Sequence, residues 1–406
     1  MSYDYHSSIC RAGYSSVDSE TELFNFAEEK YLPVGLFPET EQPAPICRIQ
    51  VNVMADGIIL GFAFHHSIMD ATGAGVIIRD FAKCCRLATG DRLDIHLEAT
   101  PELQQASREI LGRCTVRKNQ GSDPSTETHP VESPREGLDH TEDLSAQAAS
   151  FVKARYFRVP ARKVKTLKDA CNKVIRNSPS VADIEWKEFY VSSNDVFVSL
   201  LWMCLSRARY TRLNSAPSAS CICMPVNIRN RVRPPIQSSY VGNALAILKV
   251  KVDMKILLTT AGSVPTLLND DSSLDPKADS NTAWVVALSH IAHSIRMKLI
   301  SMNQIDVQDL MAYNTEVADF SCNMPTQGNF HVSSWRDNGV YDSDFGREVG
   351  HPKDMQIPAT KFDGECYILP KRPEEEPCWE VHLELQEDIM SRLDADQIWV
   401  SLISDG

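Results

Sequence analysis

Apolar and polar positions alternate most clearly over residues 49–53, and residues 58–64 then form an almost unbroken apolar run. The Asp56-Gly57 pair between these segments readily supplies the positive φ angles of a tight hairpin turn. A strand with apolar side chains on both faces is typical of a sheet that is covered on both sides. The pattern therefore predicts a β-hairpin that ends near residue 64.

Farther along the chain, residues 65–75 read as a loop, and apolar residues at helical spacing predict a helix over 76–87. Ser192 marks a strong helix start, because its hydroxyl can cap the helix while Asp195 returns the bond. The other expected elements are strands over 154–160, 241–252, 367–370 and 380–385, and helices over 164–175, 283–302 and after residue 385. This alternation of strands and helices favours an α/β fold.

Composition narrows the class of protein. The 406 residues carry a net charge of −13, which argues against a nucleic-acid binder that relies on a broad basic face. No apolar run approaches the roughly 18 residues that span a bilayer, and the N-terminus has no secretory signal. The 12 cysteines include no C-x-x-C pair, so we expect reduced thiols in a cytoplasmic protein without a membrane partner.

A change in composition suggests where the chain divides. From about residue 118 to 143 it is rich in Ser, Thr, Glu, Pro and Gly and has almost no large apolar side chain. Such a stretch cannot bury enough surface to order itself. We therefore predict an N-terminal unit over 1–117, a flexible crossover linker over 118–150 and a C-terminal unit over 151–406.

The strongest candidate for chemistry is His66, which lies beside His65 and four residues before Asp70. A histidine side chain, with an ordinary pKa of about 6.5, can take up and return a proton near neutral pH. A hydrogen-bonded core histidine is the plainer interpretation. A metal site built from both histidines and Asp70 is disfavoured, because adjacent side chains on an extended chain point to opposite faces. Gly73 and Gly75 would let a ligand approach the backbone.

Several short motifs carry a family resemblance. Residues 66–70 (H-S-I-M-D) and 344–346 (D-F-G) resemble the paired H-x-x-x-D and D-F-G motifs of the BAHD acyltransferases, which use coenzyme A. The segments 225–231 (P-V-N-I-R-N-R), 240–244 (Y-V-G-N-A) and 333–335 (S-S-W) agree in order and spacing. The likeness is strongest to the filamentous-fungal branch that includes trichothecene O-acetyltransferase, and it runs from about residue 45 to the C-terminus.

The resemblance implies an α/β fold of two chloramphenicol-acetyltransferase-like lobes with a central channel between them. The N-terminal lobe would carry the histidine motif and be completed by about 344–370. It would be shortened, because a longer portion precedes this motif in the family. His66 would remove the proton from an acceptor hydroxyl, which attacks the thioester of acetyl-CoA or another acyl-CoA without an acyl-enzyme. No permanently bound cofactor and no metal is implied, and the family is generally monomeric.

The resemblance also implies supporting roles. Asp70 would turn away from the substrate and hold the loop through an ion pair, although its spacing from His66 also allows an Asp–His dyad. Asp344 would pair with Arg229 or Arg231. Ser333 and Trp335 would supply donors to the oxyanion or contact the acyl group. The residues that bind coenzyme A are not marked, and the basic stretch over 153–168 reads as a solvated charged face.

The function implied is transfer of an acyl group, most simply acetyl, from coenzyme A to a hydroxyl of a fungal-type terpenoid, polyketide or alkaloid. One alternative is a condensation-domain relative that accepts carrier-protein thioesters; here Ala71 follows Asp70 where those domains usually have glycine. Another is an inactive, N-terminally shortened relative that acts as a binding protein.

Overall fold

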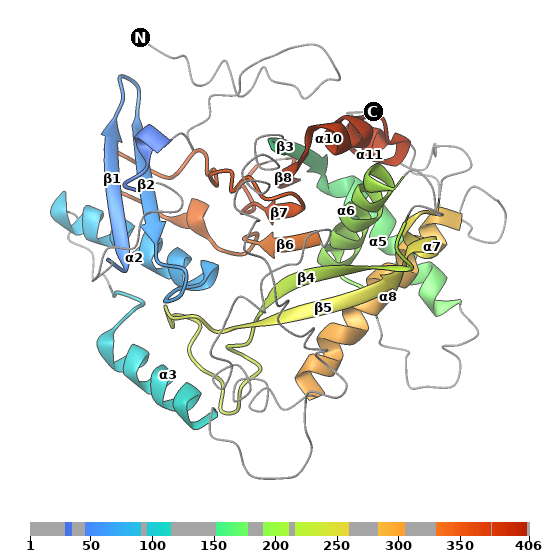
Figure 1. Cartoon of the computed structure of the whole chain (residues 1–406). Coiled ribbons are helices and arrows are strands. Elements are labelled where there is room, and N and C mark those ends of the chain that lie inside the picture. Colours follow the sequence, from blue (N-terminus) through green and yellow to red (C-terminus); the bar gives the residue numbers. More distant parts are fainter. Residues whose placement is uncertain are drawn as a thin grey trace, which may run out of the picture.

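The computed structural model describes residues 29–34, 45–90, 96–114, 152–177, 190–210, 216–259, 283–304, 330–374 and 376–403. Within these ranges the predicted hairpin is confirmed: β1 (Cys47–Val53) pairs antiparallel with β2 (Ile58–Phe64). The short helix η1 (Glu29–Tyr31) lies against the hairpin, where Gln50 and Asn52 donate hydrogen bonds to the carbonyl oxygens of Lys30 and Tyr31. The hairpin and α2 (Ala71–Ala88) form one side of the molecule, here called the small lobe (Figure 1).

A six-stranded sheet with the order β3-β8-β7-β6-β4-β5 forms the other part of the molecule, here called the large lobe. Its strands are β3 (Val152–Pro160), β4 (Ala219–Asn227), β5 (Leu245–Asp253), β6 (Phe330–Ser334), β7 (Glu365–Ile368) and β8 (Cys378–Gln386). The four other strands expected from sequence have counterparts, although β5 begins four residues later than predicted, at Leu245, and β7 ends two residues earlier, at Ile368. Strands β4 and β6 were not predicted. Their parallel ladder joins just two residue pairs, Ile222 to Phe330 and Cys223 to His331.

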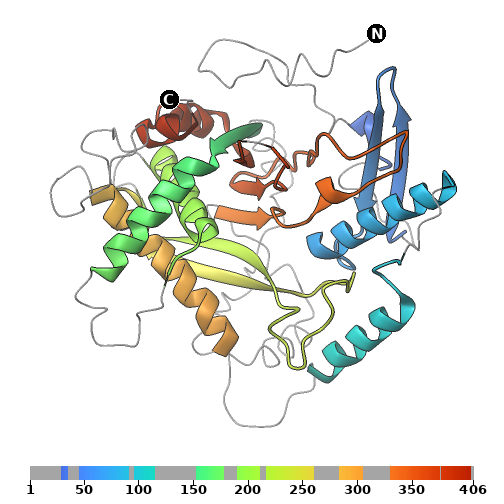
Figure 2. The ribbon, with the colours of Figure 1, turned by 180° about the vertical axis from the view of Figure 1, so that it is seen from behind.

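Helices α5 (Ala161–Arg176), α6 (Ser193–Arg209) and α8 (Ala283–Gln304) pack together and cover one face of this sheet (Figure 2). Their apolar side chains and the inward residues of the strands form the main hydrophobic core. The predicted helix start at Ser192 is confirmed as a capping box, in which the Ser192 hydroxyl accepts from the Asp195 N–H and Asp195 accepts from the Ser192 N–H. Four shorter helices of the described residues are α7 (Met254–Leu257), η9 (Val340–Asp342), α10 (Glu387–Asp394) and α11 (Gln397–Ile403).

Helix α2 (Ala71–Ala88) begins five residues earlier than predicted. Residues 71–75 read as a loop because two glycines lower the helix propensity there. The Asp70 side chain offsets this by accepting the N–H of Gly73, which caps the helix. The loop after β2 is therefore short, and it holds His66 between a strand end and a helix start.

A second, smaller core joins α2 to a distant segment of the chain. Ile78 and Ala82 of α2 pack with Val340, Tyr341 and Phe345, and Leu60, Phe62 and Met355 pack around them. We expected residues of about 344–370 to complete the N-terminal lobe. The segment that packs here instead begins at Val340, and β7 pairs within the six-stranded sheet.

Helix α3 (Pro101–Cys114) contacts the large lobe. The side-chain amide of its buried Gln104 donates to the carbonyl oxygen of Ser239 and accepts from the N–H of Val241. The predicted crossover linker, residues 118–150, lies outside the described residues. Among the helices that the structure describes, none has both the length and the apolar character that a bilayer crossing requires.

Candidate active site

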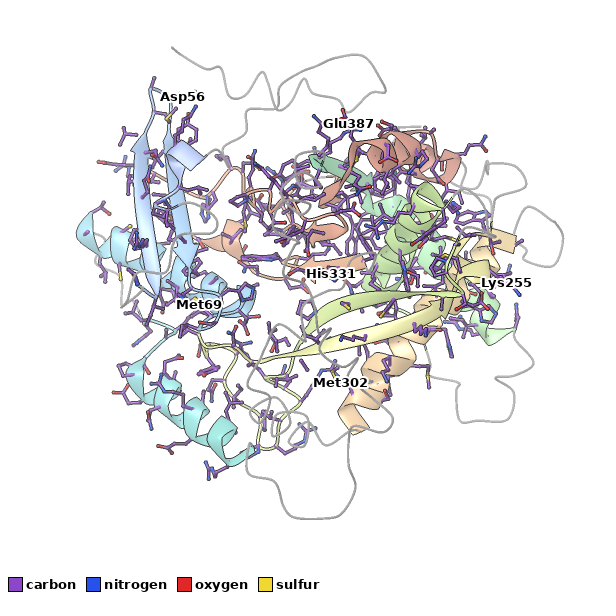
Figure 3. The ribbon with its side chains drawn as sticks, in the orientation of Figure 1. Asp56, Met69, Lys255, Met302, His331 and Glu387 are labelled. Carbon is purple, nitrogen blue, oxygen red and sulfur yellow. The ribbon has the colours of Figure 1, made fainter. Side chains whose placement is uncertain are left out.

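His66 lies in the loop between β2 and α2, and its side chain is exposed. Its backbone carbonyl accepts a hydrogen bond of 2.8 Å from the Asn243 side-chain amide. The neighbouring His65 is held by the Ser67 hydroxyl, which lies 2.8 Å from its Nδ1. Met69 of the same loop lies beside α2, on the side of β4 and β5 that faces the small lobe (Figure 3). His331 on β6 lies closer to the middle of the molecule (Figure 3).

Asp70 is 2% exposed, and its carboxylate is completely engaged. Both oxygens bond to the Arg229 guanidinium in a bidentate pair, each at 2.9 Å. The N–H groups of Gly73 and Ala244 add two further bonds of 2.9 Å. No hydrogen bond runs from Asp70 to His66 among the described residues, so the geometry favours the loop-holding ion pair over an Asp–His dyad.

Arg229, the partner of Asp70 in this ion pair, is also buried, with 1% of its surface exposed. Beyond the ion pair it donates to the carbonyls of Tyr240 and Gly242, each at 2.8 Å from Nη2. The pair connects the start of α2 in the small lobe to the segment that follows β4 in the large lobe. A bidentate guanidinium–carboxylate contact fixes both distance and angle, so this pair sets how the two lobes meet beside His66.

The expected pairing of Asp344 with Arg229 or Arg231 is wrong. The Asp344 carboxylate lies 3.3 Å from Arg86 at the end of α2 and accepts the N–H of Gly346. Arg231 instead donates to the carbonyl of Leu299 on α8. The D-F-G segment is therefore anchored to the small lobe, because Asp344 contacts the same helix against which Phe345 packs.

Gly73 and Gly75 have a structural use that differs from the expected ligand approach. A Cβ atom on Gly73 would lie 2.0 Å from the carbonyl oxygen of Val241, and one on Gly75 would lie 2.8 Å from the Asn338 side chain. Both distances are too short for real atoms. Gly73 thus lets the first turn of α2 press directly against the large lobe, and Gly75 lets it approach the Asn338 side chain in the segment before η9.

Ser333 and Trp335 lie at the end of β6, which runs parallel to β4. Ser333 is paired in register with Tyr367, and the Trp335 N–H donates to the carbonyl of Ile368 at 2.8 Å. Both side chains are half-buried. Within the described part of the chain, neither the Ser333 hydroxyl nor the Trp335 indole N–H has a hydrogen-bond partner, so both remain available as donors.

Asn243 is the site residue to which the sequence analysis gave no role. It belongs to the quoted Y-V-G-N-A segment, but nothing in that segment shows which side chain faces the histidine loop. Asn243 contacts His66 only in the folded structure, because the two residues are far apart in the sequence. Arg86 was missed for the same reason.

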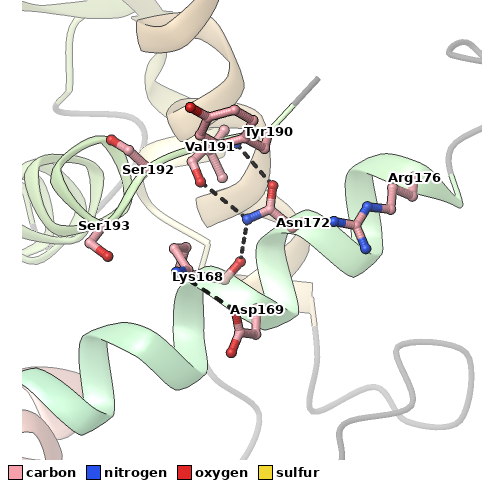
Figure 4. A pocket seen from close by; sticks show the side chains of 8 residues that line it. All are labelled: Lys168, Asp169, Asn172, Arg176, Tyr190, Val191, Ser192 and Ser193. Atoms are coloured by element: carbon pink, nitrogen blue, oxygen red, sulfur yellow. Dashed lines mark hydrogen bonds and ion pairs between the residues drawn. The ribbon is translucent and has the colours of Figure 1, made fainter. Parts of the chain in front are cut away.

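A pocket of about 590 Å³ lies away from these residues, between α5 and the start of α6 (Figure 4). Asn172 organises it by donating to Val191 O and accepting the Val191 N–H. Its wall includes Lys168, which is 3.9 Å from Asp169. None of the predicted site residues lines it, so this pocket is not the candidate active site.

The basic stretch over 153–168 is largely neutralised by neighbouring carboxylates. Lys153 contacts Glu387, Arg155 contacts Asp394, Arg158 contacts Glu374 and Glu380, and Lys165 and Lys168 contact Asp169. The expected solvated face is wrong for Lys163, which is buried and donates to Ser401 O. In the described ranges, no group of three His, Cys, Asp or Glu side chains could hold a metal ion.

The sequence matches one family model and several curated proteins, and all of them are transferases. The model of the Transferase family matches residues 23–273 and 277–398, so the likeness begins earlier than residue 45. The O-acetyltransferase ptmV of Penicillium ochrochloron is 44% identical over 394 residues, which cover 95% of this chain and 77% of that protein. The O-acetyltransferase anaAT of Neosartorya fischeri is 30% identical over 395 residues, which cover 92% of this chain and 75% of that protein.

Solved structures show the same fold. TRI101 of F. sporotrichioides, crystallised with coenzyme A and T-2, matches with a TM-score of 0.63 and 21% identity over 92% of this chain and 74% of that one. Vinorine synthase matches with a TM-score of 0.54 and 17% identity over 93% of this chain and 71% of that one. The chain therefore belongs to the Transferase family, has the two-lobe fold of the BAHD acyltransferases, and is an O-acyltransferase.

Proposed function

We propose that this protein transfers an acetyl group from acetyl-CoA to a hydroxyl of a fungal-type secondary metabolite, with His66 as the general base. Two relatives that cover most of the chain are named O-acetyltransferases. A more distant relative from Aspergillus fumigatus, 25% identical, is named for acetylation of fumigaclavine B. Crystals of TRI101 contain coenzyme A together with T-2 or deoxynivalenol. These names support an acyl-CoA donor and a small alcohol acceptor.

In the proposed reaction, the His66 imidazole takes the proton of the acceptor hydroxyl as that oxygen attacks the thioester carbonyl. The tetrahedral intermediate then expels the thiolate of coenzyme A, which recovers the proton from the imidazolium. Acetyl ester and free thiol are the products, and no group stays on the enzyme. General-base assistance of this kind contributes about 10²–10⁴ in rate.

The negative charge on the intermediate needs donors that are already in place. The Ser333 hydroxyl and the Trp335 indole N–H, both without a hydrogen-bond partner among the described residues, are proposed for this role. Asp70 and Arg229 satisfy one another and act by holding the loop. Asp344 acts in the same structural way through Arg86.

One observation carries the assignment of His66. The histidine side chain is exposed at the meeting point of the two lobes, whereas the nearby acidic side chain, Asp70, is buried with every oxygen bonded. A histidine kept for packing would itself be buried and bonded. His65 of the same loop is exposed as well, but its Nδ1 is engaged by the Ser67 hydroxyl. These contacts support His66 as the group of this loop that meets the substrate.

The test is release of free coenzyme A thiol from acetyl-CoA in the presence of a panel of alcohols that includes fumigaclavine B and deoxynivalenol. Mass spectrometry then identifies the acetylated product. We expect turnover with at least one alcohol, and His66→Ala should lower it about 10²–10⁴-fold. The matched control is His290→Ala, which removes an exposed histidine on the distant helix α8.

Three results would count against the proposal. If His66→Ala retains activity within a few-fold of the control variant, the general base is another group. If the wild-type protein binds acetyl-CoA, seen as a rise in thermal stability, yet acetylates no alcohol of the panel, the binding-protein alternative gains support. Turnover that requires an acyl carrier protein in place of acetyl-CoA would indicate the condensation-type alternative.

A further inference from the structure

The histidine loop is held from the opposite lobe by two consecutive residues, Asn243 and Ala244. The Asn243 side-chain Nδ2 donates to the carbonyl of His66 at 2.8 Å, and the Asn243 backbone N–H donates to the carbonyl of Ile68 at 3.1 Å. The Ala244 N–H donates to Asp70 at 2.9 Å. Three bonds thus follow the loop from the histidine to the aspartate that caps α2.

The bond to the His66 carbonyl differs from the other two because it comes from a side chain. The backbone bonds and the Asp70–Arg229 pair fix the far end of the loop, at residues 68–70. The Asn243 amide reaches the histidine's own peptide group. Holding that carbonyl restrains the ψ angle of His66, and hence the direction in which its Cα–Cβ bond points.

The platform that carries Asn243 is itself rigid. The Arg229 guanidinium holds the carbonyls of Tyr240 and Gly242, and Gln104 of α3 holds the N–H of Val241. The Val241 carbonyl lies against Gly73 so closely that no Cβ would fit. Because its surroundings are fixed, Asn243 can transmit the position of the large lobe to the His66 peptide.

We propose that Asn243 is a positioning residue for the acyl-transfer reaction, orienting the His66 imidazole through its hydrogen bond to the His66 carbonyl. This inference rests on the proposed function, in which His66 is the general base. Misplacing a reacting group by about 1 Å can lower a rate by up to about 10²-fold. The loss of one restraint among several should have a smaller effect than the loss of His66 itself.

The experiment compares Asn243→Ala and Asn243→Asp with the control Asn230→Ala, which removes an exposed asparagine from the same region. We expect Asn243→Ala to lower kcat about tenfold with KM for acetyl-CoA unchanged within twofold. Asn243→Asp should lower kcat further, because a carboxylate facing the His66 carbonyl accepts and cannot donate. Denaturant midpoints should stay near that of the control.

The decisive measurement places Asn243→Ala in a His66→Ala background. If Asn243 acts through His66, the double variant should be no slower than His66→Ala alone, since residues that act as a unit are not additive. A tenfold further loss would overturn the proposal and indicate a general structural role. Wild-type-like kcat in Asn243→Ala would also overturn it. Failure of the proposed function itself would look different, because the wild-type protein would then acetylate no alcohol.

Discussion

The buried pair between Asp70 and Arg229 offers a prediction whose magnitude follows from the structure. Asp70→Ala removes a carboxylate that accepts four hydrogen bonds and leaves the Arg229 guanidinium buried without its counter-charge. Breaking a buried pair from one side costs about 3–5 kcal/mol, and losing the cap of α2 costs about 1 kcal/mol more. We therefore expect Asp70→Ala to lower the free energy of unfolding by about 4–6 kcal/mol.

A double-mutant cycle measured by guanidinium denaturation checks this reasoning. Asp70→Ala and Arg229→Ala should each be strongly destabilising, and the double variant should lose about 3 kcal/mol less than the sum, because neither charge is left alone. Additive losses, or single losses below 1 kcal/mol, would refute the account.

The same pair makes a kinetic prediction that separates the two roles considered for Asp70. Asp70→Asn keeps the size of the side chain and one oxygen for the cap, so enough folded enzyme should remain for assay. Its kcat/KM should fall, while the pH at half-maximal kcat/KM should match that of the wild-type enzyme. A displaced pH profile would instead support an Asp–His dyad.

Two further predictions concern packing and pH. Gly73→Ala should destabilise the protein by more than about 2 kcal/mol in the same assay, because its Cβ meets the Val241 carbonyl; Gly112→Ala, with open space around its Cβ, should be neutral or stabilising. Burial lowers the pKa of His382 to about 4. Between pH 6.5 and pH 4 this histidine is therefore protonated in the unfolded state and neutral in the folded state, so acid favours unfolding. Stability should therefore fall by about 3 kcal/mol more in the wild type than in His382→Phe as the pH drops from 6.5 to 4, with equal losses contradicting the assignment.

The elements that sequence predicted correctly are those whose causes are local. The Asp56-Gly57 turn and the pattern around it specify the first hairpin, and the Ser192–Asp195 capping box specifies the start of α6. Each depends on residues within a few positions of one another. The position of His66 after β2 follows from the same local reasoning.

The features that sequence reasoning missed have causes far away in the chain. Helix α2 tolerates Gly73 because that glycine meets the Val241 backbone, which no local propensity records. Strand β6 has five residues, and its ladder with β4 joins two residue pairs, so it carries too short a pattern to be recognised. Strand β4 is held along its whole length by β5, a partner that lies farther along the chain. The Asp344–Arg86 contact likewise requires the α2 helix to be placed first. The motifs located the site, but they did not show which side chains meet there.

The junction beside His66 is polar although both lobes have apolar cores, and this difference has a physical reason. Apolar contacts are non-directional, so two apolar faces can slide over one another at little cost. A bidentate ion pair and hydrogen bonds are directional, because they need donor–acceptor distances of about 2.9 Å and angles above about 150°. A buried ion pair adds little net stability compared with an apolar pair of the same size. We therefore interpret Asp70, Arg229 and Asn243 as residues that fix the register of the lobes, and with it the position of His66, at the point where the proposed reaction requires it.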